Sequence, residues 1–197
     1  MVRAVPPWTE GGHLSHVAIA ANGVPVLKAA QEHNATAFIH TQADFAKWYV
    51  DDPLDMKIEQ QLPLTETPAG SGTYVYDSNA YFPIDGMGFG NYQCPNDGPN
   101  HNYHFTTRLH ATFEYKGGEN FEFTGDDDVW VFIDHRLVID IGGIHGAETK
   151  RVDLDTLGLT LGATYDIDFF QAERHCVGSN FKITTSIACF TGGGVIF

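Results

Sequence analysis

Apolar and polar residues alternate with a period of two along several stretches of the chain. The clearest stretch is residues 103–115, whose apolar face carries Tyr103, Phe105, Leu109, Ala111, Phe113 and Tyr115. Residues 165–169 and 181–187 alternate in the same way, and Thr73–Tyr76 has a strand-like composition after a glycine turn. Because successive side chains of a strand point to opposite faces, the pattern predicts half-buried strands.

Residues 129–133 are apolar at every position, which predicts a central strand covered on both faces. The pair Asp134-His135 then predicts a tight turn, with residues 136–141 returning antiparallel. Upstream, the turn-forming segment 116–120 leads into Phe121-Glu122-Phe123. We therefore expect residues 103–123 to form a hairpin that carries Gly125 to a strand end.

Elsewhere the pattern favours turns and one short helix. Thr41 is a suitable N-cap for a helix that places Phe45, Trp48 and Tyr49 on one side. Residues 1–37 are rich in proline and glycine and leave room only for short strands, while residues 81–102 form a long loop with many aromatic residues. Strands without βαβ alternation predict an all-β fold, an antiparallel β-sandwich with long surface loops and one short N-terminal helix.

Composition narrows the class of protein. The 197 residues fit one domain, and 43% hydrophobic against 18% charged residues indicates a folded chain. The formal net charge of −14 repels phosphate backbones and anionic lipids, so we do not expect nucleic acid as a partner. No apolar run approaches the length of a membrane span, so we expect no membrane insertion. The three cysteines, Cys94, Cys176 and Cys189, fit no zinc motif and allow at most one internal disulfide.

Three consecutive carboxylates, Asp126, Asp127 and Asp128, come directly before the apolar strand. Neighbouring aspartates repel unless something positive compensates, and calcium takes its ligands from carboxylates, carbonyls and water. The plainer alternative is a solvated acidic turn. The polar connection 171–180, which joins two predicted strands, is rich in oxygen donors and is a candidate to complete a calcium site.

Several segments in a fixed order closely resemble the fibro-slime domain, a branch of the protective-antigen-type β-sandwich lectin superfamily. They are Phe45-Ala46-Lys47-Trp48-Tyr49, Phe82-Pro83-Ile84-Asp85-Gly86, His101-Asn102-Tyr103-His104-Phe105-Thr106, Phe121 to Ile133, Leu137 to Gly146, Leu157-Gly158-Leu159, Ala172-Glu173-Arg174-His175 and Gly178-Ser179-Asn180-Phe181. The resemblance spans about residues 40–190. It implies a single domain over residues 1–197, with residues 1–37 as an extension or extra strands.

The resemblance also implies a function. Such domains occur in secreted or cell-surface proteins, often adhesins with several domains, and sugar-binding relatives hold calcium between two aspartates joined by a cis peptide and a second-loop Asn or Gln. By position, Asp126 and Asp127 are the expected aspartate pair, and Asn180 or Gln171 the second-loop ligand. Hydroxyls of a glycan would then complete the calcium shell. The residues expected around that ligand are Asp128, His145, Glu173, Arg174 and His175.

Three alternatives stay open at this stage. The domain could be a structural or protein-interaction module in which calcium only stiffens the loops. It could also be a metal-dependent polysaccharide-active enzyme with Glu173 and Asp128 as paired acids, although the sequence favours a non-enzyme. Histidines near the predicted site suit a transition metal, yet no HxH or HExxH pattern occurs.

A disulfide bridge between Cys176 and Cys189 could stiffen the second loop.

Overall fold

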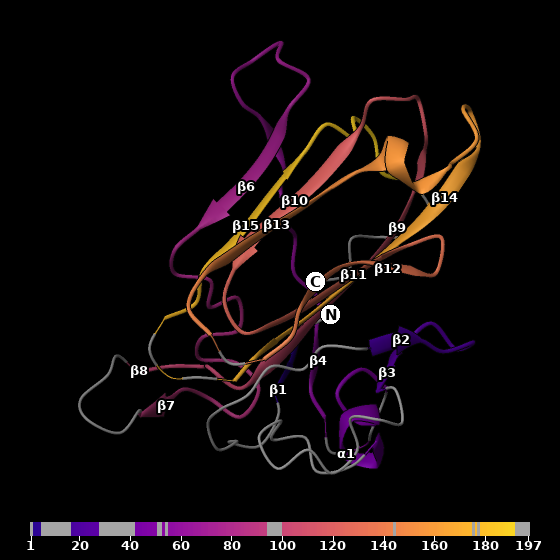
Figure 1. The fold of residues 1–197 in the computed structure, drawn as a ribbon. Coiled ribbons are helices and arrows are strands. Elements are labelled where there is room, and N and C mark those ends of the chain that lie inside the picture. Colours follow the sequence, from indigo (N-terminus) through magenta and orange to yellow (C-terminus); the bar gives the residue numbers. More distant parts are fainter. Residues whose placement is uncertain are drawn as a thin grey trace.

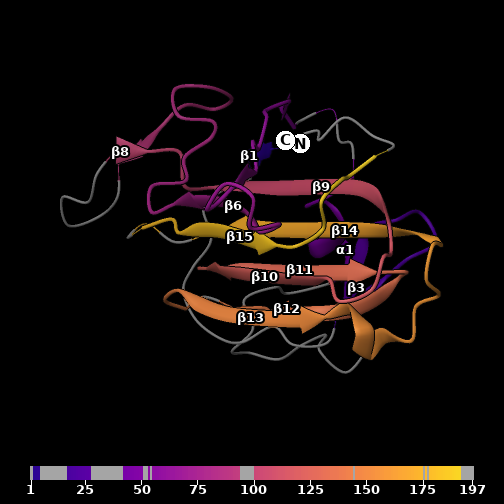
Figure 2. The same cartoon turned by 90° about the horizontal axis from the view of Figure 1, so that it is seen from above.

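The computed structural model describes residues 2–4, 17–27, 42–50, 53, 55–93, 100–143, 145–174, 176 and 178–191. Two antiparallel sheets are stacked face to face (Figures 1 and 2), which confirms the all-β sandwich predicted from the sequence. The first sheet has the strand order β12 (Arg136–Ile141), β11 (Asp128–Ile133), β14 (Thr164–Glu173), β9 (Phe105–Glu114), β1 (Val2–Ala4), β4 (Lys57–Ile58). The second has the order β13 (Glu148–Asp153), β10 (Asn120–Gly125), β15 (Phe181–Thr185), β6 (Tyr74–Ser78), β5 (Thr65–Glu66).

Smaller elements surround the two sheets. They are the pair β2 (Val17–Ile19) and β3 (Pro25–Leu27), the pair β7 (Tyr92–Gln93) and β8 (Asn100–His101), the helix α1 (Gln42–Ala46), and the 3-10 turn η3 (Leu154–Leu157). The predicted short helix is present, while its expected cap, Thr41, lies outside the described residues. None of the described helices is long and apolar enough to cross a membrane.

The sandwich core lies between the sheets and is dominated by aromatic rings. From β11, Val129, Val131 and Ile133 point into this core. The Phe181 ring lies 5.1 Å from Phe123 and 5.4 Å from Phe169, so β10, β14 and β15 meet there in edge-on ring contacts. This aromatic layer fixes the spacing of the sheets that carry the acidic triplet.

The other face of β11 is buried as well. Trp130 and Phe132 pack beneath α1 in a second apolar cluster, in which the Trp130 ring is 5.5 Å from Phe45. All six residues of β11 are buried, and the strand is paired with β12 on one side and β14 on the other. The predicted central strand is confirmed, and its second cover is the short helix.

The expected hairpin over residues 103–123 is wrong. Strand β9 pairs with β14 and β1 in the first sheet, whereas β10 pairs with β13 and β15 in the second. Phe113 and Phe121 both enter the core between the sheets. Because the two strands turn their apolar faces toward each other, the intervening turn crosses from one layer to the other instead of pairing its flanking strands.

Three later connections cross between the sheets at the opposite end of the sandwich. They link β10 to β11, β12 to β13, and β14 to β15. The register brings them together, since Gly125 at the end of β10 faces Phe181 at the start of β15, and Asp128 faces Ala172. The acidic triplet lies on the shortest of these crossings.

The turn from β11 to β12 generates a stability prediction. Asp134 and His135 have φ angles of 50° and 59°, the left-handed pair of a type I′ turn, which favours Asn-Gly. His135→Gly should raise the free energy of unfolding by about 0.5–1 kcal/mol, because a left-handed non-glycine residue costs more than the extra chain entropy of glycine. Urea denaturation measures the change. Arg136→Gly, one residue later and in the strand, should lower stability, and an equal loss in both variants would contradict the assigned turn.

Candidate acidic-loop site

Asp126 joins the two loops that the sequence analysis paired. Its Oδ1 accepts from the backbone N–H of Asn180 at 2.6 Å, and its Oδ2 accepts from Asn180 Nδ2 at 2.5 Å. A Cβ on Gly125 would lie 2.3 Å from the Asn180 carbonyl oxygen, so only glycine permits this approach. The β10–β11 crossing and the start of β15 are therefore in direct contact.

Asp127 is almost fully enclosed. It is 2% exposed, and its Oδ2 accepts from the backbone N–H of Arg174 at 2.7 Å. Its φ of 52° is unusual for a non-glycine residue. The Asp126-Asp127 peptide is trans, so the cis bond implied by the family resemblance is wrong here. In this structure the sharp crossing is made by the left-handed residue, which turns the chain without a cis bond.

Asp128 holds the loops and faces away from solvent. Its Oδ1 accepts from the Gly143 N–H at 2.7 Å, and its other oxygen pairs with Arg174 Nε. Both side chains are buried, and the Arg174 guanidinium also lies 5.4 Å from the Trp48 ring centre. This is the most strongly compensated carboxylate of the triplet, since it has both a cation and a backbone donor.

Glu173 places a further carboxyl beside Asp127. It is fully buried, and burial raises its pKa well above the usual range, with the negative charge of Asp127 adding to the shift. Burial likewise raises the pKa of Asp127. Two adjacent buried carboxyl groups favour either a shared proton or a bound cation.

The other predicted site residues lie in different places. Gln171 is 1% exposed, and its Oε1 accepts from the Thr107 hydroxyl at 2.9 Å, so this oxygen serves the β9–β14 pair and not the acidic loop. His145 is on the β12–β13 connection and contacts the carbonyl oxygens of Gly146 and Ile141 at 2.7 and 3.3 Å. His175 lies outside the described residues.

Sequence reasoning missed two supports of the loop. Gly143, which follows the predicted returning strand 136–141, donates its N–H to Asp128. Ser179 is fully buried, and its carbonyl accepts from Tyr81 N–H at 2.9 Å, which ties the connection after β6 to the second loop. The motif Gly178-Ser179-Asn180-Phe181 was the available signal, but a backbone contact leaves no residue-specific pattern.

The proposed Cys176–Cys189 bridge is wrong. Cys176 is disulfide-bonded, whereas Cys189 is an exposed free thiol. Cys94 is outside the described residues. Cys189 follows β15 toward the opposite end of the sandwich from the second loop, so it is poorly placed to staple that loop.

The arrangement offers hard oxygen donors. Asp126, Asp127 and the Asn180 amide lie at the junction of two crossings, which is the ligand chemistry that calcium prefers. Among the described residues, no three His, Cys, Asp or Glu side chains are grouped to hold a metal ion, so amide or carbonyl oxygens would have to contribute. Glu173 and Asp128 are both enclosed, which is unsuited to a pair of hydrolytic acids that must reach a glycosidic bond.

Comparisons with known proteins identify the family of this chain. Residues 69–196 match the family described as PA14 domain, whose members are commonly carbohydrate-binding modules. Among curated proteins of Dictyostelium discoideum, psiD is 43% identical over 175 residues, covering 86% of this chain and 34% of psiD. psiQ is 42% identical over 178 residues, covering 86% of this chain and 18% of psiQ.

The chain thus spans about a third or less of the length of these relatives. Among solved structures, the PA14 domain of the antifreeze protein MpAFP is similar at 13% identity and a TM-score of 0.36, covering 72% of this chain and 82% of that one. The family match covers well over half of the chain, and the psi relatives are fibro-slime proteins. The chain therefore belongs to the PA14 domain family, in its fibro-slime branch.

Proposed function

We propose that this domain is a calcium-dependent carbohydrate-binding module. The observation that carries the proposal is the double contact of Asp126 with Asn180, which unites the acidic crossing and the second loop at one edge of the sandwich. Asp126, Asp127 and Asn180 would hold the ion. Calcium would supply a positive charge and open coordination positions for glycan hydroxyls.

The donor set suits a cation for a physical reason. An Asn amide presents its N–H₂ or, after rotation by half a turn, its oxygen. In the metal-free arrangement Asn180 donates to Asp126, and in a calcium-bound state the rotated amide would present oxygen. Burial raises the pKa of the Asp127 and Glu173 carboxyl groups, so a divalent ion beside them would stabilise their ionised forms.

We further propose that residues 1–197 form one domain of a longer secreted or cell-surface protein, an adhesin whose partner is a glycan. Strand β1 supports the inclusion of the N-terminal residues in the domain, because Val2–Ala4 pairs with β9 inside the first sheet. The greater length of the psi relatives supports a multidomain parent.

The burial of the aspartate triplet favours one alternative function, that of a structural module in which calcium only stiffens the loops. Asp127 and Asp128 are 2% and 0% exposed, and Asp126 is 9% exposed. A metal held so deeply has little room for sugar hydroxyls. The two functions share the calcium site and differ in whether the ion remains accessible.

Calcium binding is tested by a matched pair of variants. Asp127→Asn should weaken calcium binding about 10- to 100-fold in isothermal titration calorimetry, because it removes a charged ligand. Asp134→Asn is the control, since Asp134 has nearly the same left-handed φ, 50° against 52°, but lies at the other end of β11. The native dissociation constant should be on the order of 10⁻⁴–10⁻³ M. Unchanged binding in Asp127→Asn would overturn the assignment.

Glycan recognition is tested separately on a glycan array. The native domain should give sugar signals in calcium that disappear in chelator, and Asp127→Asn should lack them while Asp134→Asn keeps them. Calcium binding without any chelator-sensitive sugar signal would reject the lectin and leave the structural module.

The pH dependence of the metal-free domain tests the buried pair. Glu173 binds its proton more tightly when folded than when unfolded, so its contribution to stability is complete near and below the unfolded pKa of about 4.3. That contribution is lost as pH rises through the raised folded pKa. In chelator, the free energy of unfolding from urea titrations should therefore fall with rising pH. Glu173→Gln should flatten this slope, and an unchanged slope would contradict the raised pKa of the buried Glu173 carboxyl group.

A further inference from the structure

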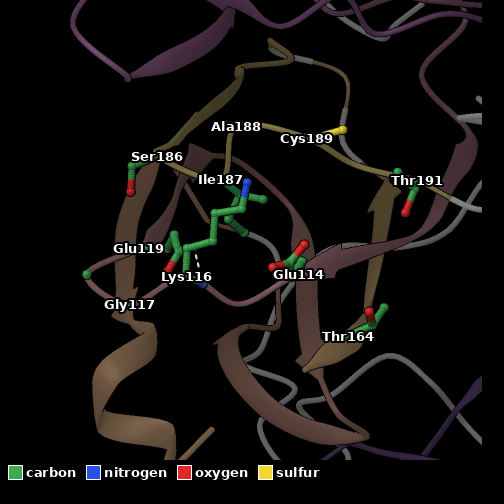
Figure 3. A pocket seen from close by; sticks show the side chains of 11 residues that line it. Glu114, Lys116, Gly117, Glu119, Thr164, Ser186, Ile187, Ala188, Cys189 and Thr191 are labelled. Atoms are coloured by element: carbon green, nitrogen blue, oxygen red, sulfur yellow. Dashed lines mark hydrogen bonds between the residues drawn. The ribbon is translucent and has the colours of Figure 1, made fainter. Parts of the chain in front are cut away.

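A cavity lies at the end of the sandwich opposite the acidic triplet. It has a volume of about 450 Å³ and is bounded by the β9–β10 turn, the first residue of β14 and the chain after β15 (Figure 3). We call it the distal cavity, and the residues that matter in it are Glu114, Lys116, Glu119, Thr164, Ser186 and Cys189. Its volume is in the range of small-molecule sites.

Hydrogen bonds hold the walls in place. Glu119 Oε1 accepts from the Lys116 backbone N–H at 2.7 Å, which closes the turn. Ser186 Oγ accepts from Asn120 N and Nδ2 at 3.0 and 3.1 Å. A ligand would therefore meet a preformed site and would spend little binding energy on ordering it.

The Glu119 carboxylate is incompletely satisfied. The residue is 7% exposed, and its Oε2 is buried without a hydrogen-bond partner in the part of the chain that the structure describes. A carboxylate oxygen only accepts, so its missing partner must be a donor. A buried carboxylate oxygen without a donor is unfavourable, and a bound N–H group would supply that donor.

The charged and hydroxyl groups of the cavity further restrict the chemical class of the ligand. Glu114 lies across the cavity from Glu119, and Lys116 supplies one positive charge against these two carboxylates (Figure 3). Ser186 Oγ accepts twice, which leaves its hydroxyl hydrogen free to donate to an oxygen. We propose that the distal cavity binds a small organic ammonium ion with neighbouring hydroxyl groups, of the size of a hexosamine. This binding needs no calcium.

Binding is measured by NMR titration in chelator, with D-glucosamine as the probe. Saturation is expected with a dissociation constant on the order of millimolar, as a ligand of this size allows. N-acetyl-D-glucosamine, which lacks the charge, should bind at least about tenfold more weakly because a hydrogen bond to a charged group is lost. Nα-acetyl-L-lysine amide is the comparison for an ammonium from a peptide, and equal binding would mean that the hydroxyl groups are not recognised, which would overturn the sugar assignment.

The location is tested with two variants. Glu119→Gln keeps an oxygen for the Lys116 N–H and should weaken glucosamine binding at least about tenfold. Glu114→Gln, at an exposed position, should weaken it more mildly and guards against misfolding of the first variant. Asp127→Asn should bind glucosamine as the native domain does, which separates this site from the proposed calcium site.

Cys189 provides an independent readout, because it is a free, exposed thiol on the cavity wall. Glucosamine should slow alkylation of Cys189 by iodoacetamide, followed by mass spectrometry, in the native domain and not in Glu119→Gln. If Lys116 instead folds back onto Glu119 and fills the cavity, glucosamine will neither saturate nor protect Cys189, and the proposal fails.

Discussion

Three consecutive carboxylates tie together the connections that carry the chain from one sheet to the other. Asp126 binds the start of β15 through Asn180, Asp127 binds the end of β14 through Arg174 N–H, and Asp128 binds the end of β12 through Gly143 N–H. Each crossing breaks the ladder of strand hydrogen bonds and leaves backbone donors without partners. The acidic residues supply the missing acceptors, so the triplet has a structural role whether or not it binds a metal.

One carboxyl group of this cluster, that of Asp128, is paired with a cationic side chain. Arg174 compensates Asp128, but Asp127 packs against Glu173 in a buried setting that favours the neutral form of both acids. Asp127 also has a left-handed backbone, a conformation that persists only where the surroundings impose it. A left-handed backbone and a raised pKa at one residue are typical of a functional site, and they carry more weight than the acidic composition alone.

The sequence predicted what depends on side-chain periodicity. The all-apolar run 129–133 could only be a strand covered twice, and it is. Pairing was predictable only where a tight turn imposes it, as at Asp134-His135. Between Phe113 and Phe121 the same alternation fits a hairpin or a layer crossing, because periodicity reports which face is buried and not which strand is the neighbour. Strand β13 was missed since it is an edge strand with exposed Lys150 and Arg151, whose charges discourage further pairing.

The candidate site was likewise only partly predictable from the sequence. The family resemblance pointed by position to Asp126 and Asp127 with Asn180 or Gln171. The structure joins Asp126 to Asn180, whereas Gln171 accepts a hydrogen bond from Thr107. The three aspartates differ in how accessible they are to a ligand, since their exposure falls from 9% at Asp126 to 2% and 0% at the next two residues. A sugar could reach a metal here only from the side of Asp126 and Asn180. The accessibility of that one carboxylate, and not the number of acidic residues, decides whether the loop can recognise a ligand or only hold the sandwich together.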